Sequence, residues 1–121
     1  MGIKNNMRVA IVGSRSFTDY EKFKTLLFNI YDIKDITEIV SGGAKGTDSL
    51  AAKFSHEYMI PIKIFFPDWD KFGKKAGFIR NEEIVDYCDE LIAFWDGDSK
   101  GTKSIIDLSN KKDKSNTICY V

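Results

Sequence analysis

The segment "IVSGGAKGTDSLAA", residues 39–52, most constrains what this chain can fold into. Three glycines separate a short apolar run from a stretch in which apolar residues recur at helical spacing. A Thr-Asp pair follows the last glycine directly. Glycine permits tight turns and lets another molecule approach the backbone closely. The segment therefore predicts a strand, a glycine turn and a helix, and the turn is either a plain connection or a contact for an anion.

The same order of strand, loop and helix recurs along the whole chain. Apolar runs predict strands at 9–12, 38–40, 62–66, 91–95 and 116–121, and apolar spacing predicts helices over 20–31, 47–59, 78–89 and 102–110. A polar leader (1–7), a long polar and aromatic loop (67–77) and a solvated connection (110–116) complete the chain. Alternating strands and helices predict one α/β domain over 1–121, Rossmann-like, with a mostly parallel five-stranded sheet and helices on both faces.

Charge and composition exclude several classes of protein. Lysine plus arginine equals aspartate plus glutamate at 18 each, which argues against the basic surface that nucleic-acid binding normally requires. No apolar run approaches the roughly 18 residues that a membrane span needs, so we expect a cytoplasmic protein. Cys88 and Cys119 lie in apolar patterns and are expected to pack as small core residues, without a metal.

Three of the predicted loops combine glycine with hydroxyl groups and a basic residue, and each follows a predicted strand. They are Gly-Ser-Arg at 13–15, Ser-Gly-Gly-Ala-Lys-Gly-Thr-Asp at 41–48 and Asp-Gly-Asp-Ser-Lys-Gly-Thr at 96–102. The carboxyl ends of parallel strands meet at one edge of a sheet, where ligands bind. Helix N-termini there offer unpaired N–H groups to an anion. The glycine spacing fits neither the dinucleotide fingerprint nor the Walker A loop, so no standard nucleotide cofactor is expected.

These loops, together with "FPDWDKFGKKAGFIRN" at 66–81, resemble the SLOG superfamily, the Rossmann-like group that includes the Smf/DprA and LOG proteins. The small YspA/YpsA-related branch, common in bacteria and phages, is the most similar, and the resemblance extends from residue 8 to 121. It implies a pocket for a nucleotide or nucleotide-derived molecule, such as an ADP-ribose-like or cyclic nucleotide signal. The residues implied to bind this ligand are Gly13, Ser14, Arg15, Ser41, Gly42, Gly43, Gly46, Thr47, Asp48, Arg80, Asn81, Gly101 and Thr102.

Single residues of this set have chemical roles that can be stated in advance. Arg15 and Arg80 suit bidentate phosphate contact, and removing either is expected to weaken binding with little loss of stability. Asp48 either accepts a ribose hydroxyl or opposes the dipole of its own helix. The aromatic side chains of the 66–81 segment either stack on the ligand or pack on the core or on a partner subunit, and the resemblance implies a homo-oligomer. These aromatic residues are Trp69, Phe72 and Phe78.

Catalysis is not the expected activity. LOG enzymes carry a PGGxGTxxE loop with a catalytic glutamate, and here Ile105 stands at the corresponding position. Asp107, two residues on, is rotated by about 200° around a helix. Asp96 and Asp98 flank the loop and remain possible substitutes.

The leading hypothesis is therefore a binding module that senses or sequesters a nucleotide-derived signal, which in a phage would be a host immune signal. The alternatives are a LOG-like hydrolase acting on nucleoside monophosphates and DprA-like binding of single-stranded nucleic acid. Zero net charge argues against the last of these.

Overall fold

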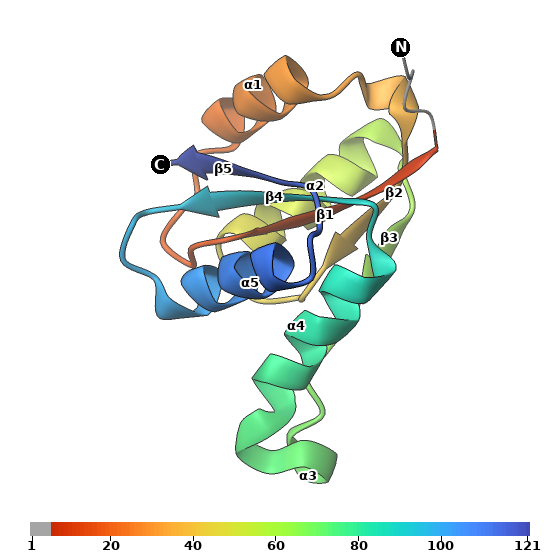
Figure 1. The fold of residues 1–121 in the computed structure, drawn as a ribbon. Coiled ribbons are helices and arrows are strands. Elements are labelled where there is room, and N and C mark those ends of the chain that lie inside the picture. Colours follow the sequence, from red (N-terminus) through yellow and green to blue (C-terminus); the bar gives the residue numbers. More distant parts are fainter. Residues whose placement is uncertain (1–5) are drawn as a thin grey trace.

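The computed structural model describes residues 6–121 and contains five strands and five α-helices along that span (Figure 1). In chain order the elements are β1 (Met7–Gly13), α1 (Tyr20–Ile30), η1 (Ile33–Asp35), β2 (Ile36–Ser41), α2 (Thr47–Tyr58), β3 (Ile62–Ile64), α3 (Trp69–Phe72), η2 (Gly73–Lys75), α4 (Ala76–Tyr87), β4 (Glu90–Trp95), α5 (Lys100–Lys111) and β5 (Asn116–Tyr120). None of these described helices is both long and apolar enough to cross a membrane. Residues 1–5 of the predicted polar leader lie outside the described residues. Its last residue, Met7, is instead buried at the start of β1, because its side chain packs into the core.

The five strands form one parallel sheet in the order β3-β2-β1-β4-β5. This confirms the predicted Rossmann-like α/β domain. The chain moves outward from β1 through β2 to β3, then crosses back through α4 to place β4 on the other side of β1. The loops that follow β1 and β4 therefore leave the sheet in opposite directions. In open sheets of this kind, ligands bind at such a switch point.

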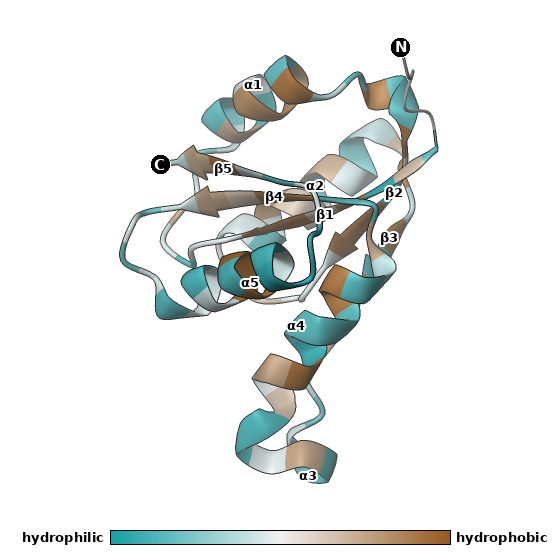
Figure 2. Cartoon of the chain, viewed as in Figure 1, coloured by the Kyte–Doolittle hydropathy of each residue, from teal (hydrophilic) through white to brown (hydrophobic). Residues whose placement is uncertain are grey.

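Helices cover both faces of the sheet, as predicted. Along β1, Val9 and Ile11 pack into the cluster beneath α1 and α2, whereas Ala10 and Val12 pack into the cluster beneath α4 and α5. A strand buried on both faces reads as an unbroken apolar run, which explains why "VAIV" carries no alternation. Figure 2 shows this hydrophobic colouring on the strands and mixed colouring along the helices that cover them.

The segment 67–77, predicted to be a loop, is largely helical, so that expectation was wrong. Asp68 caps the short helix α3 by accepting a hydrogen bond from the Lys71 amide at 3.0 Å. Gly73, at φ 58°, then ends α3, and α4 starts at Ala76 rather than at Phe78. A helix of four residues is too short for apolar periodicity to reveal. Figure 1 shows α3 and the first part of α4 projecting away from the sheet.

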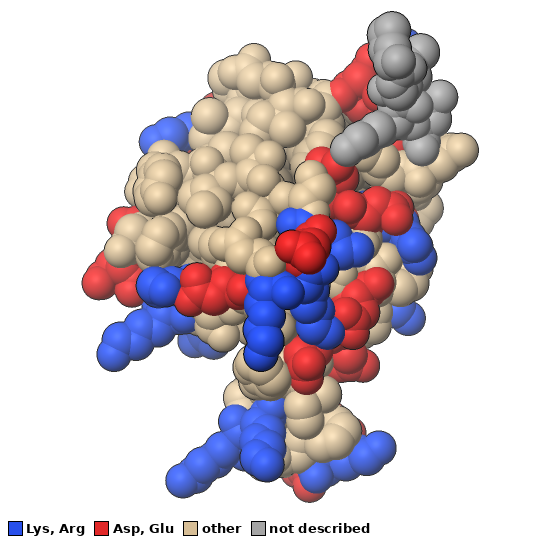
Figure 3. Space-filling view, viewed as in Figure 1, with Lys and Arg blue, Asp and Glu red and all other residues tan. Residues whose placement is uncertain are grey.

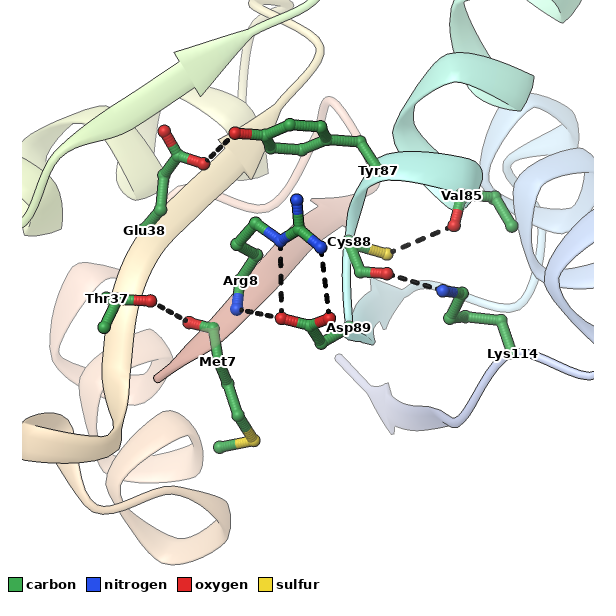
Figure 4. A network of polar contacts seen from close by, with 9 residues as sticks. All are labelled: Met7, Arg8, Thr37, Glu38, Val85, Tyr87, Cys88, Asp89 and Lys114. Carbon is green, nitrogen blue, oxygen red and sulfur yellow. Dashed lines mark hydrogen bonds and ion pairs between the residues drawn. The ribbon is translucent and has the colours of Figure 1, made fainter. Parts of the chain in front are cut away.

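A polar network stabilises the end of the sheet at which the strands begin, opposite their carboxyl ends (Figure 4). The Arg8 amide and guanidinium both donate to the Asp89 carboxylate, which lies just before β4. The Arg8 guanidinium also lies 4.6 Å from the centre of the Tyr87 ring, and the Tyr87 hydroxyl donates to Glu38 of β2. The network holds the starts of β1 and β4 together. It therefore stabilises the pairing of the two strands between which the switch point lies.

Both cysteines are free thiols that pack in the core, as predicted. Cys88 belongs to the cluster beneath α4 and α5, and burial raises the pKa of its thiol to about 11. Cys119 packs against the cluster on the other face of the sheet. The two thiols therefore serve as small apolar side chains.

Candidate functional site

A cavity of about 430 Å³ lies at the carboxyl ends of the strands, at the switch point between β1 and β4. The loops after β1, β2 and β4 all reach it, together with the side of α4, so the three glycine loops do lie at one edge. Its volume is within the range of about 300–1,000 Å³ that is typical of small-molecule sites. Eight of the predicted site residues line it: Gly13, Arg15, Gly42, Asp48, Arg80, Asn81, Gly101 and Thr102.

The other five predicted residues do not line the cavity but hold its loops in place. The Thr47 hydroxyl donates to the Ser14 carbonyl at 3.0 Å, and the Ser14 hydroxyl accepts from the Asp96 amide at 3.0 Å. These two bonds join the three loops to one another. Both side chains are buried.

The remaining three, Ser41, Gly43 and Gly46, shape the second loop. The Ser41 hydroxyl accepts from the Gly43 amide at 3.2 Å. Gly46 has φ 67°, and a Cβ atom there would collide with the Arg15 backbone. A Cβ atom on Gly43, at φ 71°, would collide with Phe66 and Ile64. These two glycines are therefore required by protein packing, whatever the ligand.

Asp48 lies in the first turn of α2 and lines the cavity, so both roles that the sequence left open stay predictions. Its Oδ2 accepts from the Ala44 amide at 2.9 Å and so closes the glycine loop onto α2. Burial raises the pKa of this carboxyl, while the Ala44 N–H and the Arg80 and Arg15 charges oppose the shift. The side chain is only 9% exposed, and its Oδ1 has no hydrogen-bond partner among residues 6–121. One carboxylate oxygen therefore remains for a donor in the cavity.

Arg80 is more structural than the sequence suggested. Its Nη1 donates to the Gly42 carbonyl at 2.8 Å and its Nε to the Asn81 side-chain oxygen at 3.0 Å. Burial lowers the pKa of the guanidinium, and the Asp48 charge opposes that change. The side chain thus links α4 to the glycine loop. We expect its removal to reduce stability, which corrects the expectation of little loss.

Of the two cations that line the cavity, Arg15 is the one whose side chain makes no hydrogen bond to the protein within residues 6–121. Its side chain is exposed, lines the cavity, and makes no hydrogen bond or ion pair within the described span 6–121. Within the same span, no hydrogen bond engages the amides of Arg15 and Ser16. By contrast, the amides of Gly43, Ala44 and Thr47 already donate to protein oxygens. The amides of Lys45 and Gly46 in that same loop after β2 make no hydrogen bond to residues 6–121, so both loops keep main-chain N–H groups for an anion.

Three polar residues that the predicted site omitted also line the cavity: Ser16, Asp96 and Ser99. Asp96 Oδ1 accepts from the amides of Ser99 and Asp98 at 2.7 and 2.8 Å, and these bonds lower the pKa of its carboxyl. Its Oδ2 accepts from the Ser16 hydroxyl at 3.3 Å. An acid followed by Gly-Asp-Ser is the signal of such a side-chain turn. The Asp96 carboxylate is thus ionised and accepts three hydrogen bonds from the protein. It is therefore poorly suited to replace the LOG glutamate as a proton donor.

The position of the LOG glutamate contributes no acid to the cavity. Ile105 lines the cavity with an apolar side chain, beside Val12 and Ile84. Asp107 is exposed and forms an ion pair with Lys103 at 2.7 Å outside the lining. The rotation expected from the helix pitch accounts for this position.

The predicted aromatic residues lie on the projecting arm formed by α3 and the start of α4. Trp69, Phe72 and Phe78 are 59%, 37% and 50% exposed, and none of them lines the cavity. These three rings therefore cannot stack on a ligand in this cavity as the structure stands. Contact with a partner subunit stays a prediction.

Comparisons with known proteins agree with this architecture. Residues 7–72 match the YspA, cpYpsA-related SLOG family. The gene 61 protein of Mycobacterium phage D29 is 32% identical, over 79% of this chain and 82% of that protein. The DNA processing protein A (DprA) of Streptococcus pneumoniae has a similar fold, with a TM-score of 0.75 at 17% identity over 93% of this chain. The chain spans 50% of the length of that structure. With more than half of its residues matched, the chain belongs to the YspA, cpYpsA-related SLOG family.

Proposed function

We propose that this protein binds a phosphate-bearing nucleotide, or a molecule derived from one, in the cavity at the switch point. One observation carries the proposal: the unpaired Arg15 guanidinium and the unpaired oxygen of buried Asp48 line the same cavity. These two groups carry opposite charges, so together they can donate hydrogen bonds to a ligand and accept hydrogen bonds from it.

The lining supplies the three kinds of contact that a nucleotide needs. Arg15, with the free amides of Arg15 and Ser16, suits a phosphate group. Asp48 suits a hydroxyl donor such as that of a ribose. The apolar side chains of Val12, Ile84 and Ile105 offer a surface to a base or sugar ring. An ADP-ribose-like molecule or a cyclic nucleotide carries all of these groups.

Binding without cleavage fits this chemistry better than hydrolysis does. Hydrolysis of an N-glycosidic bond needs a placed acid or base of suitable pKa. The Asp96 carboxylate is held by three donors and has a lowered pKa, and Ile105 is apolar. Asp48, the other lining acid, is held by the Ala44 amide, and the Arg80 and Arg15 charges oppose the rise in its pKa. A sensor or a sequestering protein is therefore the role we favour, and the phage relative makes sequestration of a signal the setting to test first.

The test is calorimetry with nucleoside monophosphates, ADP-ribose, cyclic ADP-ribose isomers and cyclic dinucleotides, followed by mass spectrometry of the recovered ligand. We expect at least one to bind and to be recovered unchanged. Arg15→Ala is expected to weaken binding by about tenfold or more, since a hydrogen bond to a charged group contributes about 1.5–3 kcal/mol. Thermal unfolding is expected to stay unchanged, because the Arg15 side chain makes no hydrogen bond or ion pair with residues 6–121.

Two variants serve as controls for this measurement. Arg15→Lys keeps the charge without the bidentate fork, so an intermediate affinity is expected. Lys34→Ala removes an 80% exposed lysine at the other end of the sheet and is expected to change nothing. Release of free base or ribose phosphate would instead establish a hydrolase. Salt-dependent binding of oligonucleotides, without small-molecule binding, would establish a nucleic-acid protein. Unchanged affinity in Arg15→Ala would remove that residue from the site.

A further inference from the structure

The two edges of the sheet differ in how they are protected. The edge strand β3 has only three residues, lies between Pro61 and Pro67, and carries the exposed Lys63. Proline, lysine and short length are the devices that keep an edge strand from pairing with another chain. The edge strand β5 has five residues, Asn-Thr-Ile-Cys-Tyr, with no charge and no proline. Among residues 6–121, one edge strand is thus protected and the other has no strand paired with it.

The open edge presents a regular row of backbone groups. The Ser115 carbonyl accepts from the Leu91 amide at 3.0 Å, and the Val121 amide donates to the Trp95 carbonyl at 2.9 Å. Alternate residues of a parallel strand bond to the same neighbour, so Thr117 and Cys119 continue this series toward β4. Asn116, Ile118 and Tyr120 then direct their N–H and C=O groups away from β4. Among residues 6–121, no strand pairs with them.

This row is self-complementary. Ile118 is its midpoint, with one outward residue two positions before it and one two positions after it. When a second copy is placed antiparallel about a two-fold axis at Ile118, Ile118 faces Ile118 and Asn116 faces Tyr120 of the other copy. Three donors and three acceptors on each copy then meet their counterparts, giving about six main-chain hydrogen bonds. Such an isologous contact closes on itself at two copies.

The surroundings of β5 suit an identical partner. Ile118 and Cys119 are half-buried, and Tyr120 is 67% exposed with its ring 5.8 Å from that of Trp95. Figure 3 shows a broad uncharged area over α1 and β5, whereas lysine, arginine and acidic residues gather along α5 and α4. Because β5 itself carries no charge, two copies paired along this strand bring no like charges together within it. A partner recognised by charge would instead dock on the α4 and α5 side.

From these observations we propose that β5 pairs antiparallel with β5 of a second copy, forming a closed dimer with one continuous sheet. The contact uses no residue of the cavity lining, so it is independent of the proposed ligand. It also differs from the association through the projecting arm that the aromatic residues had suggested. Contact through the arm stays a separate prediction.

The experiment measures molecular mass by analytical ultracentrifugation across a wide concentration range. Wild type is expected to reach twice the 13.8 kDa of one chain. Ile118→Pro removes an outward N–H without touching the bonds to β4, and it is expected to be monomeric. Ile64→Pro is the matched control. It makes the same change at an outward position of β3, since Phe65 N and Pro61 O bond to β2, and it is expected to stay dimeric.

If Ile118→Pro does not fold, two other measurements still test the proposal. One is the molecular mass of Tyr120→Lys, and the other is amide hydrogen exchange in wild type. Tyr120→Lys puts a charge on the open edge and is expected to give a folded monomer. In wild type, the amides of Ile118 and Tyr120 are expected to exchange slowly at high concentration and quickly on dilution. A wild type that is monomeric at every concentration overturns the proposal. So does a dimer that survives both β5 substitutions, or assembly that continues beyond two copies.

Discussion

Gly13 and Gly101 both line the cavity, yet a methyl group has opposite effects at the two positions. A Cβ atom on Gly13 would lie 2.5 Å from the Thr47 hydroxyl and press on the Phe94 carbonyl. A Cβ atom on Gly101, in the first turn of α5, meets nothing within 4 Å. The first glycine therefore serves the packing of β1 against β4 and the start of α2. The second leaves open space beside the cavity.

We predict that Gly13→Ala lowers the free energy of unfolding by about 2 kcal/mol or more, because a packed backbone has to move. Gly101→Ala is expected to leave stability unchanged or to raise it by up to about 1 kcal/mol, because alanine favours a helix over glycine. Urea unfolding of both variants measures the difference. If the two variants lose the same free energy of unfolding, the close contacts at Gly13 do not explain the loss.

The Asp96 carboxylate gives the cavity rim a pH-dependent stability. Hydrogen bonds from the Ser99 and Asp98 amides lower its pKa below the ordinary value of 3.8. The folded protein therefore binds fewer protons at this group than the unfolded chain does, and stability rises with pH across this window. The contribution is complete above the ordinary pKa and disappears as the pH falls through the lowered one.

We predict that Asp96→Asn lowers Tm at neutral pH and that the deficit shrinks as the pH drops below about 4, where the wild-type group is protonated as well. Thermal unfolding followed by circular dichroism between pH 2 and 7 measures it. Asp98→Asn is the matched control in the same loop, since its carboxylate accepts no hydrogen bond from residues 6–121. A constant deficit across the whole range would show that the charge of Asp96 is irrelevant.

At the scale of elements, the two helices that start at the cavity begin in different ways. Helix α2 begins after Gly46, without a side-chain cap, and is anchored instead by Thr47 and Asp48. Helix α5 begins after Ser99, whose hydroxyl accepts from the Thr102 amide and bonds to the Thr102 hydroxyl at 3.0 Å. A cap of this kind stabilises the first turn of a helix.

We predict that Ser99→Ala lowers the free energy of unfolding by about 1 kcal/mol, the usual loss when a serine cap is removed. Chemical denaturation monitored by helical circular dichroism measures it. Ser104→Ala, at an exposed position of the same helix, is expected to have almost no effect. Stability that is unchanged in Ser99→Ala would mean that the Trp95 indole, which donates to the Ser99 carbonyl, holds this turn alone.

At the scale of the whole molecule, strand order decides where the cavity forms. Placing β4 beside β1 brings the 96–102 loop to the other two loops, and the Arg8 network fixes that pairing at the far edge. No local sequence pattern predicts the strand order. The chain passes through α3 and α4 between β3 and β4, and nothing in those residues alone says beside which strand β4 will lie. The open β5 edge is a result of the same order and of the number of strands.

The sequence by itself determined the α/β class, the parallel sheet and the meeting of three loops at one edge. Apolar runs and helical spacing act over a few residues, so they can be read from the chain directly. Only the tertiary structure decided which polar groups remain free. Arg80 is engaged by the carbonyl of Gly42, and Thr47 by that of Ser14, across 38 and 33 residues. Contacts at such distances depend on packing, and they leave Arg15 and one oxygen of Asp48 open to the cavity.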